Sequence, residues 1–284
     1  MRDPYSSCPC VVVGIDGSRS AVQAAIWAVD EAIDRDVPLQ LLYAIESVSN
    51  DPDDTAAEVA SAERAVHNVF TTIESMGKPV KLESEIVHAH PRTALLEASR
   101  SAAMVCLGSA GLAHAVAGHI GSTASAVAAG AHCPVAIVPA NPAGPGLVLA
   151  VVDGSPASNT VVERSVAEAL LRASPLRVFS MRQPRSADTS DGVADRSQRV
   201  KAELEHRFTH WRRNHPNLDI EPVDEHSSLL NYLEHLQRKA TPVQLVVVGP
   251  VRPGPLDVLW SPSGRAALEA AHCALMICDR QWWL

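Results

Sequence analysis

The sequence has few aromatic residues, no long apolar run and no block of positive charge. Phe, Trp and Tyr make up 4% of its 284 residues, so small side chains must supply much of the core packing. No apolar run approaches the roughly 18 residues that a membrane-spanning helix requires, and the stretch after Met1 does not resemble a secretory signal. We therefore expect no membrane contact and a cytoplasmic location.

The charge excludes one class of partner. The formal net charge is −8, and no basic block is longer than the Arg212-Arg213 pair. Binding to a nucleic-acid backbone needs clustered positive charge, so nucleic acid is not an expected partner. A small anion remains compatible with this composition, because backbone amides can hold it locally.

Patterns of catalysis and of metal binding are also missing. The sequence has no GxxxxGK[ST], GxSxG or HExxH motif, so no catalytic residue is assigned. Of the six cysteines, only the Cys8-Pro-Cys10 segment looks pairable, and no second pair at zinc-finger spacing accompanies it. The other cysteines lie in apolar strand-like runs, where we expect small buried hydrophobes: Cys106, Cys133, Cys273 and Cys278.

Internal repetition gives the domain organisation. The segment VVVGIDGS (Val11–Ser18) recurs as LAVVDGS (Leu149–Ser155), and AHCPVAI (Ala131–Ile137) recurs as AHCALMI (Ala271–Ile277). An offset of about 140 residues is a domain length rather than the period of a solenoid. We expect two homologous domains, residues 1–140 and 147–284, joined by a Pro- and Gly-rich linker at 141–146.

Apolar runs of strand length alternate with helical patterns in the first copy. The spacing of three and four is clearest from Thr55 to Met76, and Ser18 or Ser20 can cap a helix that ends near Asp34. Strands are expected at residues 10–15, 38–45, 79–87, 103–107 and 134–138, with further helices at 93–101 and 122–131. This alternation predicts an α/β fold in which helices cover both faces of a parallel sheet.

The most informative segment runs from Gly108 to Ser122. It follows an apolar strand, leads into a helix and carries spaced glycines at Gly108, Gly111 and Gly121. Glycine lets backbone N–H groups approach a ligand, and the helix N-terminus adds donors and a positive dipole end. Ser122 and Thr123 can cap that helix or donate to a phosphate oxygen. The pattern predicts a loop that binds phosphate.

Three segments should meet at the carboxyl edge of such a sheet, where ligands of this fold class bind. They are Asp16–Ser18 after the first strand, Tyr43–Glu46 after the second, and the glycine loop after the fourth.

The chain resembles the universal stress proteins in their tandem two-domain form. The resemblance covers essentially the whole chain and is most specific at the motif G-x2-G-x9-G-[ST], which Gly108, Gly111, Gly121 and Ser122 match without a gap. It implies two tandem Rossmann-like domains (adenine nucleotide alpha hydrolase-like), each with a five-stranded parallel sheet flanked by helices. It also implies ATP as the ligand and nucleotide-dependent regulation in stress or slowed growth.

The resemblance implies roles for single residues. Asp16 would lie at the nucleotide, the main chain of Ala44 at the adenine edge, and Gly108 by the ribose. Ala110 departs from many members, which carry a basic residue or histidine there, so one phosphate contact is lost while the backbone cradle is kept. The full set of expected nucleotide-binding residues is Ile15, Asp16, Gly17, Ala44, Gly108, Ser109, Gly111, Gly121, Ser122 and Thr123.

The second copy departs from the motif. Aligned from Gly249, Arg252 and Pro262 replace the second and third glycines, while Ser263 and Asp153 remain. Three prolines also stiffen this loop and remove N–H donors. We expect one nucleotide per chain, bound by the first domain, and a degenerate second site.

The histidines and the C-terminal tryptophans are weaker signals. His88 and His90 alternate as two metal ligands would, yet no third ligand accompanies them, so surface histidines are expected, as for His114 and His119. His132 and His272 recur at equivalent positions, which favours a structural role at a helix end. The Trp282-Trp283 pair has no explanation from the sequence beyond packing or a subunit contact.

Three functions are compatible with the sequence. The first is an ATP-binding regulator with an unidentified protein partner, in which the domains form an internal pseudo-dimer and two chains a homodimer. The second is a slow ATPase or phosphotransferase, assisted by Mg²⁺ near Asp16 and Ser122. The third is a nucleotide-independent interaction protein.

Overall fold

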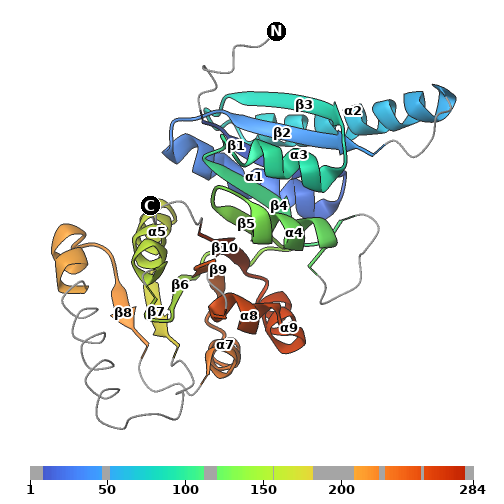
Figure 1. Ribbon diagram of the computed structural model, residues 1–284. Helices are drawn as coiled ribbons and strands as arrows, with labels where there is room; N and C mark the ends of the chain where they lie inside the picture. The colour runs from blue at the N-terminus through green and yellow to red at the C-terminus, as the bar shows by residue number, and fades with distance from the viewer. Residues whose placement is uncertain are drawn as a thin grey trace. The chain divides into compact units, whose positions relative to one another are not determined.

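The computed structural model describes residues 9–46, 52–111, 120–155, 157–181, 208–223, 228–250 and 253–278. Spatial contacts divide the chain into two compact units, Met1–Pro142 with Leu268–Leu284, and Ala143–Ala267. Both are α/β units with parallel strands and flanking helices, which confirms the predicted fold class (Figure 1).

The first unit contains a parallel sheet with the strand order β3-β2-β1-β4-β5. Its strands are β1 (Val11–Ile15), β2 (Leu39–Ile45), β3 (Leu82–His88), β4 (Met104–Gly108) and β5 (Val135–Val138). Its helices are α1 (Arg19–Asp34), α2 (Pro52–Ser75), α3 (Pro91–Ala98) and α4 (Ser122–Gly130). The strand order reverses between β1 and β4, which is the position at which such sheets bind ligands.

One strand of the first unit comes from the other end of the sequence. β10 (Ala274–Ile277) pairs antiparallel with β5, with Met276 opposite Ala136. Both strands are fully buried and apolar, so each satisfies the backbone of the other where water is excluded. The sequence repeat did not reveal this pairing.

The second unit repeats the parallel arrangement in the strand order β9-β6-β7-β8. The strands are β6 (Leu147–Val152), β7 (Leu176–Ser180), β8 (Ile220–Pro222) and β9 (Val243–Val248). The helices are α5 (Ala157–Leu171), α7 (Leu229–Arg238), α8 (Pro255–Trp260) and α9 (Pro262–Ala271), the last of which leads to β10. Residues 208–214 are helical as well.

Helix α1 shows how small residues form the core. It buries a face of alanines against the sheet, and the Oγ of Ser18 caps its start by accepting a hydrogen bond from the N–H of Ala21. The fully buried Glu31 is paired with Arg35 one turn later at 2.5 Å. Glu168 and Arg172 repeat this ion pair at the end of α5.

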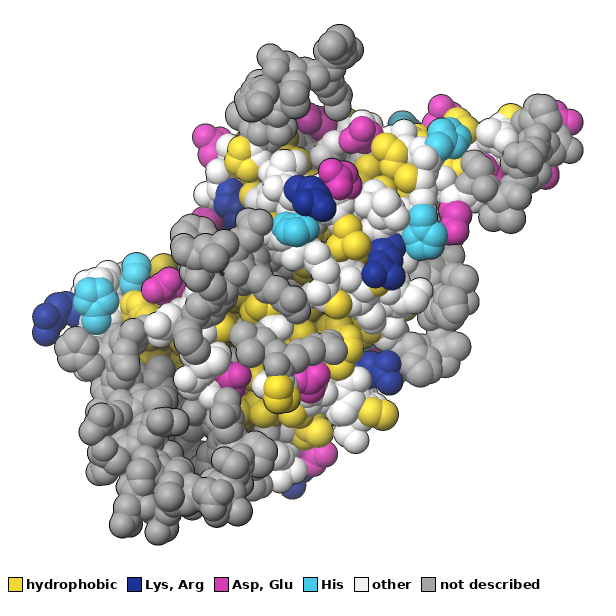
Figure 2. Space-filling model, viewed as in Figure 1, with side chains coloured by type: hydrophobic (Ala, Val, Ile, Leu, Met, Phe, Trp, Pro, Cys, Tyr) yellow, Lys and Arg dark blue, Asp and Glu magenta, His cyan; other side chains and the backbone are white. Residues whose placement is uncertain are grey.

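None of the described helices is long and apolar enough to cross a membrane. On the face shown in Figure 2, the described Lys and Arg side chains lie singly among acidic and polar ones.

We expect Arg35→Met to lower the free energy of unfolding by about 3 kcal/mol, because it leaves the carboxylate of Glu31 buried without its cation. The control is Arg100→Met, which removes the partner of Glu97 from a pair in which both side chains are mostly exposed. That change should cost less than about 1 kcal/mol. Urea denaturation measures both values, and equal losses would contradict the prediction.

Candidate functional site

The turn after β1 has a defined geometry. Gly17 has a φ of 83°, which a residue with a Cβ rarely adopts, and the N–H of Ser18 donates to Oδ1 of Asp16 at 2.9 Å. Ile15 ends the strand as a buried residue, and Asp16 is half-buried. The carboxylate is therefore held at the carboxyl edge of the sheet.

The end of β4 packs directly on the start of α1. A Cβ at Gly108 would lie 2.3 Å from Oγ of Ser20 and 2.7 Å from the backbone N of Ala21. Such contacts do not occur between real atoms, so this approach requires glycine. The Oγ of Ser20 also donates to the carbonyl oxygen of Ala110, which fixes the first residues of the glycine loop on α1.

The second motif glycine lies against the acidic side chain. A Cβ at Gly111 would lie 2.8 Å from Oδ2 of Asp16. The structure thus brings together the turn after β1 and the loop after β4, as the sequence pattern predicted for the sheet edge. Residues 112–119, with His114 and His119, lie outside the described residues.

The third motif glycine has a different environment. The N–H of Gly121 donates to the carbonyl oxygen of Ser109 at 2.8 Å and so closes the base of the loop. A Cβ at Gly121 would meet only atoms at 3.8 Å or more, and its φ of −56° suits any residue. Neither packing within the described residues nor backbone strain accounts for glycine here.

The predicted capping of α4 is wrong. Gly121, rather than Ser122 or Thr123, is the N-cap residue, and no side chain caps the helix. Ser122 and Thr123 already lie in the first turn, where a side chain no longer reaches the N–H groups it would have to cap. Among the described residues, no side chain therefore accepts a hydrogen bond from the N–H groups in the first turn of α4.

Strand β2 contributes the third segment. Tyr43 pairs in register with Ile15, and the half-buried Ala44 follows it. Burial raises the pKa of the Tyr43 hydroxyl, and the carboxylates of Asp16 and Glu58 add to the shift. The Tyr43 hydroxyl and the carboxylates of Asp16 and Glu58 therefore lie near one another at this edge.

Sequence reasoning missed Glu58. It lies on α2, and its Oε2 is buried without a hydrogen-bond partner among the described residues. In the sequence, Glu58 looks like an acidic residue on the solvated face of an amphipathic helix. No sequence pattern indicates that it lies near Tyr43.

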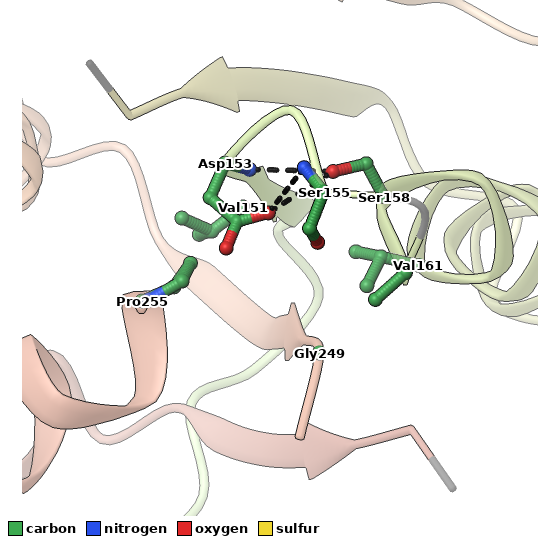
Figure 3. Close-up of a pocket in the computed structure, with 8 residues that line it drawn as sticks. Val151, Asp153, Ser155, Ser158, Val161, Gly249 and Pro255 are labelled. Atoms are coloured by element: carbon green, nitrogen blue, oxygen red, sulfur yellow. Dashed lines mark hydrogen bonds between the residues drawn. The ribbon is translucent and has the colours of Figure 1, made fainter. Parts of the chain in front are cut away.

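The second copy preserves the turn but closes the crevice. Gly154 has a φ of 74°, and the N–H of Ser155 donates to Oδ1 of Asp153 at 2.9 Å, as in the first copy. Gly249 and Pro255 approach this turn, and the space between them is too small for a water molecule (Figure 3). Arg252 lies outside the described residues.

The helix that follows is also different from α4. Pro262 is the first residue of α9, and the Oγ of Ser261 accepts a hydrogen bond from the N–H of Gly264 at 3.1 Å. A protein side chain thus accepts from a first-turn N–H of α9, whereas no side chain of the described residues caps the first turn of α4.

The histidines that the sequence singled out have structural roles or ordinary partners. Nδ1 of His90 accepts a hydrogen bond from the N–H of Arg92 at the start of α3, and its Nε2 lies 3.6 Å from Oε1 of Glu46. The N–H of His132 donates to Ser99, and His272 has a φ of 52° at the end of α9. Within the described ranges, no three His, Cys, Asp or Glu side chains form a group that could hold a metal ion.

The cysteines in the strand-like runs are buried, as predicted: Cys106, Cys133, Cys273 and Cys278. Burial raises the pKa of the Cys273 thiol to about 12. Cys10 has a free thiol that donates to Oε1 of Gln40, while Cys8 and the Trp282-Trp283 pair lie outside the described residues.

Known proteins resemble this chain over nearly its full length. A model of the universal stress protein family matches residues 10–139. One universal stress protein of Mycobacterium tuberculosis is 41% identical over 286 residues, which cover 96% of this chain and 97% of that protein. A second one from the same organism is 35% identical, with 95% and 96% covered. A crystal structure of a universal stress protein from Archaeoglobus fulgidus superposes with a TM-score of 0.67 at 15% identity, covering 95% of this chain and 96% of that one.

The glycine environments predict different costs for the same substitution. Gly108→Ala should destabilise the ligand-free protein by about 2 kcal/mol, because the new Cβ overlaps the backbone of α1. Gly121→Ala should cost less than about 1 kcal/mol, the range of an N-cap change. Chemical denaturation without nucleotide measures both, and an equal or reversed order would refute this account of the loop.

Proposed function

The chain belongs to the universal stress protein family. We propose that its first domain binds ATP between the Asp16 turn and the Gly108–Ser122 loop. Binding would regulate the protein in stress or slowed growth by ordering the loop and changing the surface offered to a protein partner. We also propose the domain limits 1–140 and 147–284 and a cytoplasmic homodimer.

The open N-terminus of α4 is the observation that carries this proposal. No side chain of the described residues caps its first-turn N–H groups, and neither packing against those residues nor the backbone angle requires glycine at position 121. Backbone donors and the positive dipole end at such a position suit a phosphate group. A glycine that the protein itself does not need is accounted for by a ligand that approaches its Cα closely.

The proposed complex assigns the expected residues to three parts of the nucleotide. The main chain of Ala44 would meet the adenine edge, and Gly108, Ile15, Asp16 and Gly17 would lie by the ribose. The phosphates would lie against the loop and the start of α4, at Ser109, Gly111, Gly121, Ser122 and Thr123. Mg²⁺ bound with the nucleotide would supply positive charge where the described part of the loop carries no Lys or Arg.

The second domain supports the same assignment by contrast. Its Asp153 turn has the geometry of the Asp16 turn, yet the space beside it, which Gly249 and Pro255 line, has no room for a water molecule. Ser261 also caps the first turn of α9. We therefore propose one nucleotide per chain.

Isothermal titration of the full chain with MgATP tests this proposal. We expect a stoichiometry of one ATP per chain, and at least about a tenfold loss of affinity in Asp16→Ala and in Gly121→Val, which fills the base of the loop. The matched control is Asp153→Ala, which breaks the same hydrogen bond in the other copy and should leave the affinity unchanged.

Three outcomes would overturn the proposal. They are two nucleotides per chain, equal effects of the Asp16 and Asp153 variants, and no binding by a protein that is purified free of nucleotide. Phosphate release above the blank that Asp16→Ala abolishes would favour the slow ATPase over a purely binding role.

A further inference from the structure

A cavity of about 620 Å³ lies in the second unit, away from the crevice at Asp153. It is formed at the amino ends of β6, β7 and β9, together with the last turns of α5 and α7, whereas Asp153 follows the carboxyl end of β6. Its volume falls within the roughly 300–1,000 Å³ of pockets that hold a small organic ligand. The proposed nucleotide site uses none of these residues.

One wall of the cavity is apolar and rigid. Tyr232 from α7 lines it, is almost completely buried and stacks on Phe179 of β7 with ring centroids 5.6 Å apart. Leu236 lies one turn further along α7. The wall is completed by Pro145, Leu147, Pro175 and Pro242. An apolar ring or chain would be removed from water on this wall.

Basic side chains from three elements line the rest of the cavity. They are Arg172 at the end of α5, Arg177 of β7, and His235 and Lys239 of α7. No Asp or Glu belongs to the described lining. The carboxylates of Asp219 and Glu221 hold the guanidinium of Arg177 from outside the lining, at 3.0 and 3.3 Å, and so fix its position. The cavity thus combines an apolar wall with basic side chains, of which Arg172 and Arg177 are already paired with carboxylates outside the lining.

Two of these cations have partners in the fold. Arg172 is ion-paired with the buried Glu168, and Arg177 is paired with Asp219 and with Glu221, its neighbour on β8. Lys239, the C-cap residue of α7, is therefore the cation of the lining on which an anion would chiefly depend. At the same place in the first unit, Gln40 is the second residue of its strand and donates to Glu85 at 2.8 Å. Burial raises the pKa of the Cys10 thiol there, and the carboxylates of Glu83 and Glu85 add to the shift, so that edge is acidic.

We propose that this cavity binds a small organic anion that carries one charged group on an apolar ring or chain. The apolar body would lie on Tyr232 and Leu236, and the anionic group would meet Arg177 and Lys239. The site is independent of the ATP site in the first domain.

Fluorescence titration with 8-anilinonaphthalene-1-sulfonate, an aromatic anion of this class, tests the proposal on the full chain. Saturating MgATP is present throughout, so that the probe cannot report the nucleotide site. We expect one probe per chain, and Lys239→Glu should weaken its binding about fivefold or more, which corresponds to one close charge interaction. The matched control is Arg238→Glu, the neighbouring residue of α7, which carries the same charge but does not line the cavity and should change the affinity less than twofold.

Two further measurements distinguish the effect of the probe's negative charge from its fit to the cavity. Thr241→Trp, which fills the cavity from its rim, should abolish probe binding while ATP binding persists. N-phenyl-1-naphthylamine, the uncharged counterpart of the probe, should bind without responding to Lys239→Glu. Competition by decanoate or by naphthoate then distinguishes a chain from a ring as the preferred apolar body.

The proposal is overturned if the probe does not bind in the presence of MgATP, or if the two charge reversals on α7 have equal effects. It is also overturned if the uncharged probe responds to Lys239→Glu as strongly as the anion does. None of these results bears on ATP binding by the first domain.

Discussion

The absence of a side chain at position 108 is the constraint on which the candidate site depends. Because Gly108 has no Cβ, the end of β4 approaches the first residues of α1 at a distance that no other residue permits. The Oγ of Ser20 can then donate a hydrogen bond to the carbonyl oxygen of Ala110, and Gly111 lies next to the carboxylate of Asp16. One close backbone contact therefore places the glycine loop on the turn after β1.

The two copies separate what the fold needs from what a ligand needs. An aspartate followed by a glycine with positive φ ends the first strand in both units, and its carboxylate accepts the same hydrogen bond at 2.9 Å. This turn leads into α1 in the first unit and into α5 in the second. The turn alone therefore accounts for an aspartate at position 153, and it would account equally for Asp16. The distinguishing features are the loop glycines and the start of α4, which no described side chain caps, whereas Ser261 caps the first turn of α9 in the second copy.

Sequence patterns predicted the local structure of the first copy to within a few residues, because strands that are buried on both faces and amphipathic helices have distinct periods. The sequence offered Ser18 or Ser20 as the cap of α1, and the structure shows that it is Ser18. The cap of α4 was missed, since Ser122 and Thr123 suit an N-cap by residue type and the register depends on where the loop closes, at Gly121 and Ser109. Glu58 and the cavity beside Tyr232 were missed because each depends on residues distant in sequence that only the fold brings together.

The position of Asp16 limits how a nucleotide can lie in the proposed site. Oδ2 of Asp16 faces the Cα of Gly111, so a phosphate placed between them would meet a carboxylate at close range. Like charges at such a distance repel. In the proposed complex we therefore expect the terminal phosphates toward the first turn of α4, which offers N–H donors, and the ribose hydroxyls, which can donate to a carboxylate, beside Asp16. This orientation keeps Gly108 by the ribose and Gly121 and Ser122 by the phosphates, as the family motif implies. Gly111, which the motif places by the phosphates, would then lie where the ribose and the phosphates meet.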